Sequence, residues 1–592
     1  MNMLNTTGQT LDGHKLALLN NRFDGIVRAM TNTLLRTARS AILNTARDFS
    51  CCILTSEHEM LAMAESLPIH VMSGPDLMAQ WMVRFNPELR RGDAFLHNSP
   101  YHGNSHAADW TILVPVVDDS GRHRFTVIAK AHLADCGNAI PTTYSAAAKD
   151  VYEEGALIFP CVKVQEDYRD REDVLRMAQV RIRVPELWHG DFLALLGAAR
   201  IGERKLLDLV QEMDGAELAA YPGEWFNYSE RLMVDAIRRL PSGETTTSGW
   251  HDPIPGALPD GLEVAAHLRI DRDAALIEVD LTDNPDCQPC GLNLTESTAR
   301  TAAMMGVFTG LGSVVPPNAG SFRRLRVRLR ENCVVGIPKH PYSCSVATTN
   351  LSELLANCVV RAVAGLGDGH GMAATGKASP ASTAVISGID NRPGRGPFVN
   401  QLWLGFTAGA AGPVADGWLT ILGLGAAGFL RRDSIEILEM KYPVLIHSEH
   451  IVRDSEGAGR YCGSPAAQVE FGPLDGDLTA VWLSEGTKYE AIGVQGGENG
   501  CLARQYVRDL NGELSRPLGT YEQVTVKPGE RVVSIGSGGA GYGAPGTRDP
   551  NRVARDVQRG WVSPQRARDT YRVSVDEHGA VDAAQTATLR SG

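Results

Sequence analysis

Two predicted strands near residue 120 are flanked by histidines and an aspartate. Residues 110–117 and 125–129 are rich in β-branched and aromatic side chains, and a short turn of Asp, Ser and Gly separates them. His106 and Asp109 precede the first strand, and His132 follows the second. An antiparallel hairpin places the start of its first strand beside the end of its second. The sequence therefore predicts that these three side chains lie close together.

The residue types at this point favour a metal site. Two imidazoles and a carboxylate bind a divalent ion and leave positions open for water and substrate, so His106, Asp109 and His132 are the predicted ligands. Asp135, which repeats the His-x-x-Asp spacing with His132, or His102 would orient a ligand or act as general base. Two alternatives remain open: an iron site of the two-His-one-carboxylate oxygenase kind, and a hydrogen-bonded cluster without metal.

Length and charge restrict the class of protein. A chain of 592 residues predicts two to four domains, and 43% hydrophobic with 21% charged residues is ordinary for a globular protein. The formal net charge of −12 argues against a nucleic-acid partner, which a basic surface would attract.

Cysteine usage and apolar stretches predict a cytoplasmic protein with no membrane partner. The eleven cysteines show no repeating spacing, which is typical of reduced thiols. Residues 1–8 lack the features of a secretory signal. The longest apolar stretch, 406–430, is interrupted by glycines, Pro413 and Asp416, so it is a poor membrane span.

Hydrophobic periodicity predicts an α+β fold. Apolar residues recur at helical spacing over 15–47 and 191–213, with Asp191 as N-cap and Gly215 as the stop of the second helix. Residues 262–281 alternate as strands do.

Three domains are predicted. An N-terminal α/β domain over 1–245 carries the metal site, and a middle α/β domain spans 250–390. The segment 391–592 is predicted to be β-rich, because glycines and short apolar runs dominate the chain from about residue 380.

Two glycine-rich segments resemble nucleotide-binding loops, but each departs from its motif at a position that nucleotide binding requires. Residues 371–378 nearly match the phosphate-binding P-loop, but Ala378 stands where the motif needs a hydroxyl for magnesium. Residues 423–428 read Gly-x-Gly-x-x-Gly, but 435–440 are predicted as strand rather than the long helix that a dinucleotide fold requires. Neither segment is predicted to bind a nucleotide.

Two further motifs carry weaker signals. Cys287 and Cys290 form a single Cys-x-x-Cys, which lacks the second pair of a structural zinc site. The glycine run 536–543 has three possible interpretations: close approach of its backbone to another group, a lid that moves, or a plain loop. A helix is predicted over about 551–559, after Asp549-Pro550.

Several motifs together resemble the hydantoinase B/oxoprolinase family, over about residues 20 to 571. They are Arg47-Asp48-Phe49-Ser50-Cys51, the run from Gly92-Asp93 to Asn98-Ser99-Pro100-Tyr101-His102-Gly103, His106-Ala107-Ala108-Asp109, 131–137, Arg183-Val184-Pro185-Glu186-Leu187, 457–460, 536–543 and 560–564. Length and pattern are similar to the smaller subunits of two-component hydantoin-utilising enzymes. The family also includes 5-oxoprolinases, other lactam hydrolases, and subunits of acetone and acetophenone carboxylases.

The resemblance implies a metal held by His106, Asp109 and His132, joined by Asp48. It also implies an A-type partner subunit, which usually carries an ATP site. The metal is divalent, with Mn, Zn, Mg and Fe all open.

The expected activity is the opening of 5-substituted hydantoins, or a related lactam, to N-carbamoyl amino acids together with that partner. Asp135 is the predicted catalytic base and His102 is predicted to steady the oxyanion. One alternative is a subunit of an ATP-dependent ketone carboxylase. Another is a scaffold for a catalytic partner of the A type.

Overall fold

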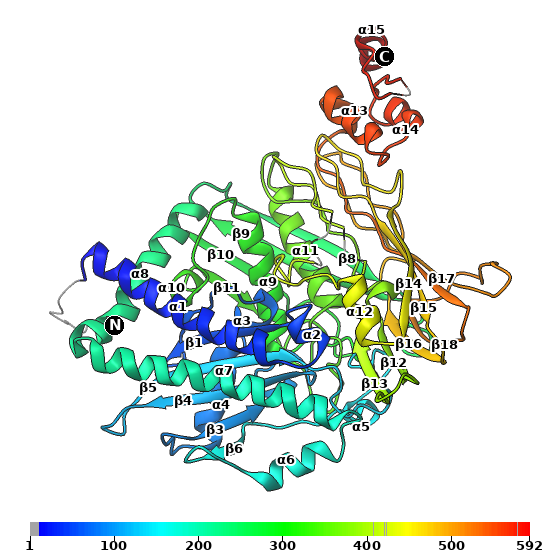
Figure 1. Cartoon of the computed structure of the whole chain (residues 1–592). Helices are drawn as coiled ribbons and strands as arrows, with labels where there is room; N and C mark the ends of the chain where they lie inside the picture. The colour runs from blue at the N-terminus through cyan, green and yellow to red at the C-terminus, as the bar shows by residue number, and fades with distance from the viewer. Residues whose placement is uncertain (1–10, 406–407, 420, 422, 577, 592) are drawn as a thin grey trace.

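The computed structural model describes residues 11–405, 408–419, 421, 423–576 and 578–591. Helices and strands are mixed along the chain, which confirms the predicted α+β class, and the strands of the described residues form four sheets. In Figure 1 the N-terminal sheet (blue to cyan) lies below the second sheet (green), and the later strands (yellow to orange) stand to one side. The predicted domain boundaries stay a prediction.

The first sheet has seven strands in the order β2-β1-β5-β4-β3-β6-β7. The central pairs are antiparallel, and β4 and β5 form the predicted hairpin. The strands are β1 (Phe49–Thr55), β2 (Met60–Ala62), β3 (Ala94–His97), β4 (Asp109–Val117), β5 (His123–His132), β6 (Val162–Glu166) and β7 (Arg169–Asp170).

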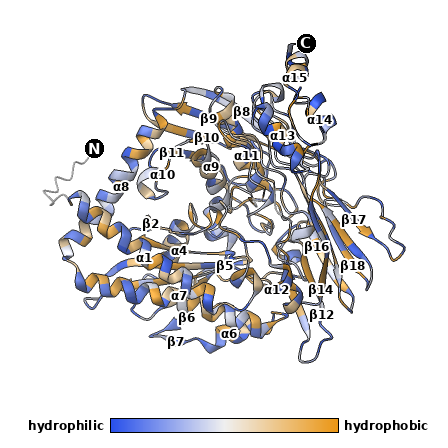
Figure 2. Cartoon of the chain, turned by 45° about the horizontal axis from the view of Figure 1, so that its top comes forward, coloured by the Kyte–Doolittle hydropathy of each residue, from blue (hydrophilic) through white to orange (hydrophobic). Residues whose placement is uncertain are grey.

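Helices cover both faces of this sheet, so β4 is buried along its whole length. The long helices α1 (Gly13–Thr37) and α7 (Pro185–Glu212) pack on each other and on one face, where Trp110 and Ile112 join their core. The short helix α4 (Pro75–Phe85) lies on the other face with Leu113. Figure 2 shows apolar and polar residues alternating around the long helices, as one buried face requires. The other helices here are the short α2 (Ala41–Asn44), α3 (Pro68–Val71), α5 (Val151–Glu154) and α6 (Glu172–Gln179), and the long α8 (Gly215–Ile237).

The second sheet has the order β11-β10-β9-β8 and buries one face only. Its strands are β8 (Gly243–His251), β9 (Leu262–Asp271), β10 (Leu276–Asp280) and β11 (Leu325–Arg328), so the strands predicted within 262–281 are confirmed. Helices α9 (Glu296–Gly310) and α11 (Asn350–Gly365) pack together in its core. Gly306 allows their close approach, because an added Cβ there would meet Val359 Cβ at 2.5 Å.

The last part of the chain is β-rich, as predicted. Two four-stranded sheets, β13-β12-β16-β18 and β14-β15-β19-β17, enclose a small apolar core. The strands are β12 (Val385–Ile389), β13 (Pro397–Gln401), β14 (Val444–Ile451), β15 (Ala467–Pro473), β16 (Leu478–Leu483), β17 (Arg504–Arg508), β18 (Tyr521–Val526) and β19 (Arg531–Ile535). The helices that follow are α13 (Pro550–Gln558), which was predicted, α14 (Pro564–Asp569) and α15 (Ala583–Ser591).

The glycine run 536–543 is packed against other backbone. A Cβ added at Gly539 would lie 2.0 Å from the carbonyl oxygen of Gly409, and one at Gly541 2.1 Å from that of Ala458. The nitrogen of Gly457 also donates a hydrogen bond to the carbonyl oxygen of Gly539, at 2.8 Å. Of the three predicted interpretations, close approach of backbone is the one that this packing supports.

Two predicted element boundaries are wrong. Helix α7 begins at Pro185 rather than at Asp191, whose buried carboxylate instead accepts hydrogen bonds from the nitrogens of Arg39 and Ser40. Gly215 does not stop that helix but begins α8, with Asp214 as its N-cap. Among the described residues no helix is long and apolar enough to cross a bilayer.

Candidate metal centre

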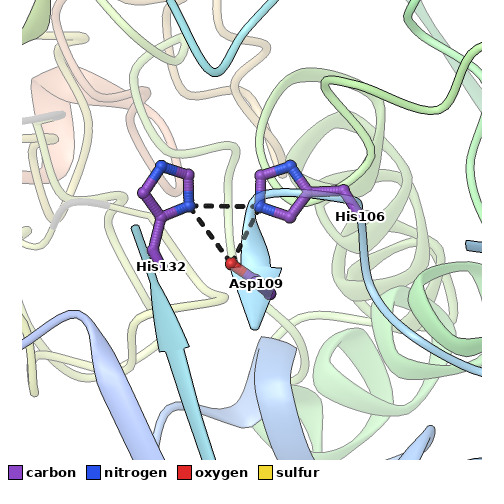
Figure 3. Close-up of side chains that lie close together, drawn as sticks. All are labelled: His106, Asp109 and His132. Carbon is purple, nitrogen blue, oxygen red and sulfur yellow. Dashed lines mark hydrogen bonds and ion pairs between the residues drawn. The ribbon is translucent and has the colours of Figure 1, made fainter. Parts of the chain in front are cut away.

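The β4–β5 hairpin brings the three predicted ligands together. Asp109 at the start of β4 pairs in register with His132 at the end of β5, and the Asp109 nitrogen donates to the carbonyl oxygen of His106. His106 Nε2 lies 2.8 Å from Asp109 Oδ1, His132 Nδ1 lies 3.1 Å from the same oxygen, and the two nitrogens lie 3.1 Å apart. Figure 3 shows this triangle of side chains, which is almost completely buried. Its ligand atoms are close enough together to hold one metal ion.

The outer ring nitrogens fix how the two imidazoles face the centre. His106 Nδ1 lies 2.7 Å from the carbonyl oxygen of Ser345, which can only accept, so Nδ1 donates and Nε2 turns a lone pair inward. In the matching tautomer of His132, Nε2 donates to Thr143 Oγ1 at 3.0 Å and Nδ1 faces the centre. Two nitrogen lone pairs and a carboxylate oxygen then face one point. Such a donor set fits a divalent cation, whose ligands at about 2.0–2.2 Å lie roughly 3 Å apart from one another.

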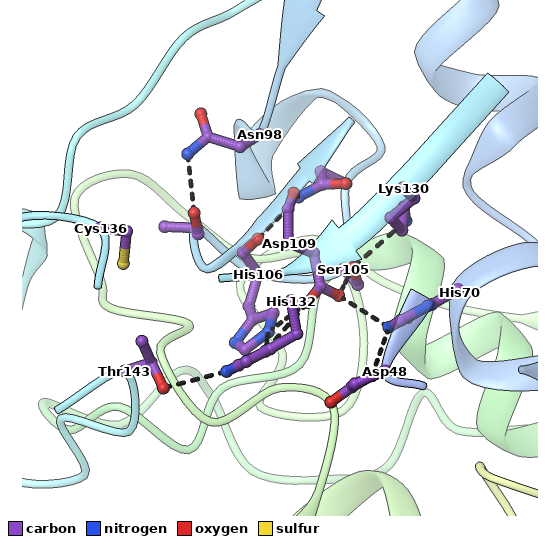
Figure 4. A network of polar contacts seen from close by, with 12 residues as sticks. Asp48, His70, Asn98, Ser105, His106, Asp109, Lys130, His132, Cys136 and Thr143 are labelled. Carbon is purple, nitrogen blue, oxygen red and sulfur yellow. Dashed lines mark hydrogen bonds and ion pairs between the residues drawn. The ribbon is translucent and has the colours of Figure 1, made fainter. Parts of the chain in front are cut away.

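A second layer of polar side chains surrounds Asp109 (Figure 4). Ser105 Oγ donates to Asp109 Oδ2, and Lys130 Nζ donates to Ser105 Oγ at 3.2 Å. His70 Nε2 lies 3.4 Å from Asp109 Oδ2 and 3.6 Å from Asp48 Oδ1, so it connects the two carboxylates. Sequence reasoning missed both His70 and Lys130. A lysine in the apolar strand β5, two residues before His132 and on the same face, was a usable signal, whereas His70 stands alone in its segment.

Burial and charge set the protonation of the group. Burial alone would raise the pKa of Asp109, but the neighbouring His106 and His70 outweigh it and hold that pKa well below its usual value. Burial lowers the pKa of His132, and it lowers the pKa of His70 to about 3. The pKa of His106 is raised, because the charge of Asp109 and its hydrogen bond outweigh burial. A metal binds imidazole in its neutral form, so metal binding at this centre would compete with protonation of His106.

Asp48 is brought to the same place but not into the triangle. Burial first, and then the charge of Asp109, raise the pKa of its carboxyl to about 8. The carboxyl of Asp48 is thus close enough to Asp109 for the two charges to interact, and His70 lies between the two carboxylates. Its predicted role as a metal ligand stays a prediction.

The buried Asp48 carboxyl gives a pH prediction. Its pKa in the fold, about 8, is above the ordinary 3.8, so the stabilisation present below pH 3.8 is lost as the pH rises toward 8. In the absence of metal, Asp48→Asn is expected to raise the urea midpoint of unfolding at pH 8 and to have little effect near pH 4. If Asp48 is a ligand, excess divalent metal at pH 8 should give wild type the higher urea midpoint of the two proteins.

Urea unfolding followed by fluorescence at pH 4 to 8, with EDTA or with metal, measures this effect. Asp273→Asn in the exposed turn between β9 and β10 is the control and should shift nothing. A constant difference between Asp48→Asn and wild type at all pH values would contradict the buried-carboxyl account.

A pocket adjoins the centre. Asp48, His70, Asp109 and His132 line its polar part, and its cavity volume is about 60 Å³. The apolar side chains that line it are Leu67, Ile69, Trp403 and Leu430. We refer to it as the first pocket.

The structure does not bring the two predicted catalytic residues to this pocket. His102 is half-buried between Trp81 and Phe85, with Nδ1 2.7 Å from Ser99 Oγ. The carboxylate of Asp135 accepts hydrogen bonds from the backbone and the guanidinium of Arg183, at 2.6 and 2.9 Å. Neither is among the described residues that line the first pocket. Their catalytic roles stay predictions that the geometry does not favour.

The glycine loop 423–428 binds a carboxylate of the chain itself. Glu353 accepts hydrogen bonds from the nitrogens of Leu424 and Gly425, both at 2.7 Å. A Cβ at Gly423 or Gly425 would lie 2.6 or 2.8 Å from this carboxylate, which explains the glycines. The prediction of strand over 435–440 is wrong, because residues Ile435–Lys441 form helix α12, capped by Ser434.

The segment 371–378, which nearly matches the P-loop motif, also makes internal contacts. Lys377, at the lysine position of the motif, forms a buried ion pair with Glu485 at 2.7 Å. It also donates to the carbonyl oxygen of Trp250, at 2.9 Å. The Lys377 ammonium is therefore already neutralised by a carboxylate of the chain. That this segment binds no nucleotide stays a prediction.

Comparison with known proteins places the chain in a family. The family described as Hydantoinase B/oxoprolinase matches residues 12–545. The beta subunit of caprolactamase from Pseudomonas jessenii is 31% identical, over 98% of this chain and 99% of that one. The crystal structure of ATP-dependent caprolactamase from Pseudomonas jessenii superposes with a TM-score of 0.86 at 29% identity, covering 99% of this chain and 100% of that chain.

Two further comparisons have lower sequence identity. The B component of the "Putative D-/L-hydantoinase" of Pseudomonas sp. (strain NS671) is 26% identical over the full length of both chains. Nucleotide-free acetone carboxylase shares the fold, with a TM-score of 0.85 at 18% identity over 98% of this chain and 82% of that one. The chain belongs to the hydantoinase B/oxoprolinase family.

Proposed function

We propose that this chain is one subunit of an ATP-dependent hydrolase that opens cyclic amides. The observation that carries the proposal is the buried convergence of His106 Nε2, Asp109 Oδ1 and His132 Nδ1 beside a pocket lined by both polar and apolar side chains. The chain also resembles the caprolactamase beta subunit along its whole length. A chain that served only as a scaffold has no need of such a centre.

His106, Asp109 and His132 would hold the ion, with Asp48 as the proposed fourth ligand. When bound, a divalent metal polarises an amide carbonyl and lowers the pKa of a bound water. Ser345 and Thr143 keep the two imidazoles in the tautomers that face the centre. His70 lies between the carboxylates of Asp48 and Asp109, which positions both.

The walls of the first pocket favour an apolar ring. Leu67, Ile69, Trp403 and Leu430 give this pocket a hydrophobic surface. Ring methylenes of a lactam gain free energy by burial there. We therefore propose lactams as the first substrate class and 5-substituted hydantoins as the second.

The ATP site is proposed to lie on a partner subunit. The two phosphate-loop-like segments of this chain are satisfied internally, by Glu353 and by the Lys377–Glu485 pair. The similarity to a protein named as a beta subunit supports a second chain, and an A-type subunit is the proposed partner. The likeness to acetone carboxylase is one of fold, so it adds no weight to the ketone-carboxylase alternative.

Co-expression with an ATP-binding A-type subunit tests the proposal. The purified complex is assayed with five- to seven-membered lactams, a 5-substituted hydantoin, and a ketone with bicarbonate, with and without ATP and EDTA. We expect ATP-dependent, EDTA-sensitive ring opening by the complex and none by either chain alone. Carboxylation of the ketone without opening of any amide would contradict the proposal.

A further inference from the structure

A second pocket lies beside the first. Its cavity volume is about 290 Å³, and Glu353, Gly376 and Ala378 line both pockets. Glu353, Asn357 and Arg361 line it from α11. These residues are spaced i, i+4, i+8 and so occupy one face of the helix, which places Arg361 about 12 Å along the axis from Glu353. The pocket therefore extends from the wall of the candidate active site to an arginine.

The guanidinium of Arg361 has an unpaired charge. Its Nη1 donates to the carbonyl oxygen of Ser248 at 3.0 Å, and its Nε is buried without an acceptor. No carboxylate of the described residues lies within ion-pair distance of it, and burial lowers its pKa. A partly buried cation without a counter-charge is costly, so it points to a ligand that supplies one.

The other cations of the second pocket do not share this property. Lys377 is neutralised by Glu485, as described above. Lys488 is exposed, with Nζ 5.0 Å from the centre of the Tyr489 ring. Tyr489 packs against Trp250 with ring centroids 5.4 Å apart. Among the described residues lining this pocket, Arg361 is thus the partly buried cation without a carboxylate partner that a ligand could pair with.

We propose that the second pocket binds an oxyanion through Arg361, and that this oxyanion is the carboxylate of the ring-opened product. The identity of the product rests on the proposed function. A guanidinium pairs with a planar carboxylate through two parallel hydrogen bonds. Opening a neutral ring creates a carboxylate that the substrate lacks, and Arg361 offers it a positive charge without a counter-ion in the adjoining pocket. Inorganic phosphate is the other oxyanion that fits this chemistry.

Calorimetric titration of the full-length chain tests the site without partner, ATP or turnover. The probes are 6-aminohexanoate, hexylamine, which lacks the carboxylate, and inorganic phosphate. Arg361→Gln is expected to weaken 6-aminohexanoate binding at least about tenfold. Arg361→Lys is expected to weaken it less, because lysine keeps the positive charge but cannot form the two parallel hydrogen bonds of a guanidinium. Hexylamine binding should not change. Arg269→Gln, an exposed arginine on β9, is the matched control and should bind like wild type.

The outcomes separate the possibilities. Arg361-dependent binding of phosphate but not of 6-aminohexanoate would keep the oxyanion site and overturn the product as its ligand. Equal binding of both oxyanions by wild type and Arg361→Gln, or no binding by wild type, would overturn the site. Because binding is measured apart from catalysis, an inactive complex would contradict the proposed function without affecting this result.

Discussion

Replacing His106 with alanine is expected to reduce ring opening by at least about 1000-fold and to remove the bound metal from the chain. Loss of a mere supporting partner of a metal ligand costs about 10–100-fold in affinity or activity, and His106 is proposed to be a ligand itself. The substitution also leaves the buried carbonyl oxygen of Ser345 without its hydrogen bond, which costs about 1–3 kcal/mol, less than the stability of a typical folded domain. The fold is therefore expected to persist.

Three measurements on His106→Ala check this expectation: turnover of the complex, metal content by elemental analysis, and circular dichroism. His450→Ala, an exposed position on β14, is the control and should match wild type in all three. His102→Ala separates the sequence prediction from the geometry, since the geometry expects it to keep its metal. Full activity of His106→Ala would end the role assigned to this side chain.

Replacing Gly539 with alanine is expected to destabilise the chain by about 3 kcal/mol or more, at the upper end of what overpacking costs. The added Cβ would lie 2.0 Å from the carbonyl oxygen of Gly409 and within the layer of backbone around Gly457. Backbone, unlike the end of a flexible side chain, cannot move aside without breaking its own hydrogen bonds.

Gly536→Ala is the matched control from the same glycine run. Its Cβ would have no neighbour closer than 3.7 Å, so its thermal midpoint should stay within a degree or two of wild type. Thermal unfolding of the two variants measures the difference. Equal melting of Gly539→Ala and Gly536→Ala would show that the glycine run is not held by close backbone packing.

The sequence predicted what depends on local pattern. The hairpin of β4 and β5 follows from two apolar runs and a polar turn, and its register alone brings Asp109 beside His132. Alternation over 262–281 predicted β9 and β10 for the same reason. Asp48 was found only through the family resemblance, because nothing in its own segment distinguishes it.

The sequence could not predict what depends on distant contacts. Ser345, which orients His106, lies 239 residues further along the chain, and His70 reaches the centre from the short helix α3. Glu353 binds the glycine loop from 71 residues away, so the loop looked like a nucleotide motif. The segment 435–440 is short and mostly apolar, as a strand can be, yet the cap by Ser434 and the helix-forming residues Glu, Leu and Met favour helix α12.

Crystals of the chain grown with a divalent metal, and an anomalous difference map at its absorption edge, test the central claim most directly. The account predicts one peak about 2.0–2.2 Å from His106 Nε2, Asp109 Oδ1 and His132 Nδ1. A map with no peak there, or with the metal held by other side chains while this triangle stays hydrogen-bonded, would contradict it.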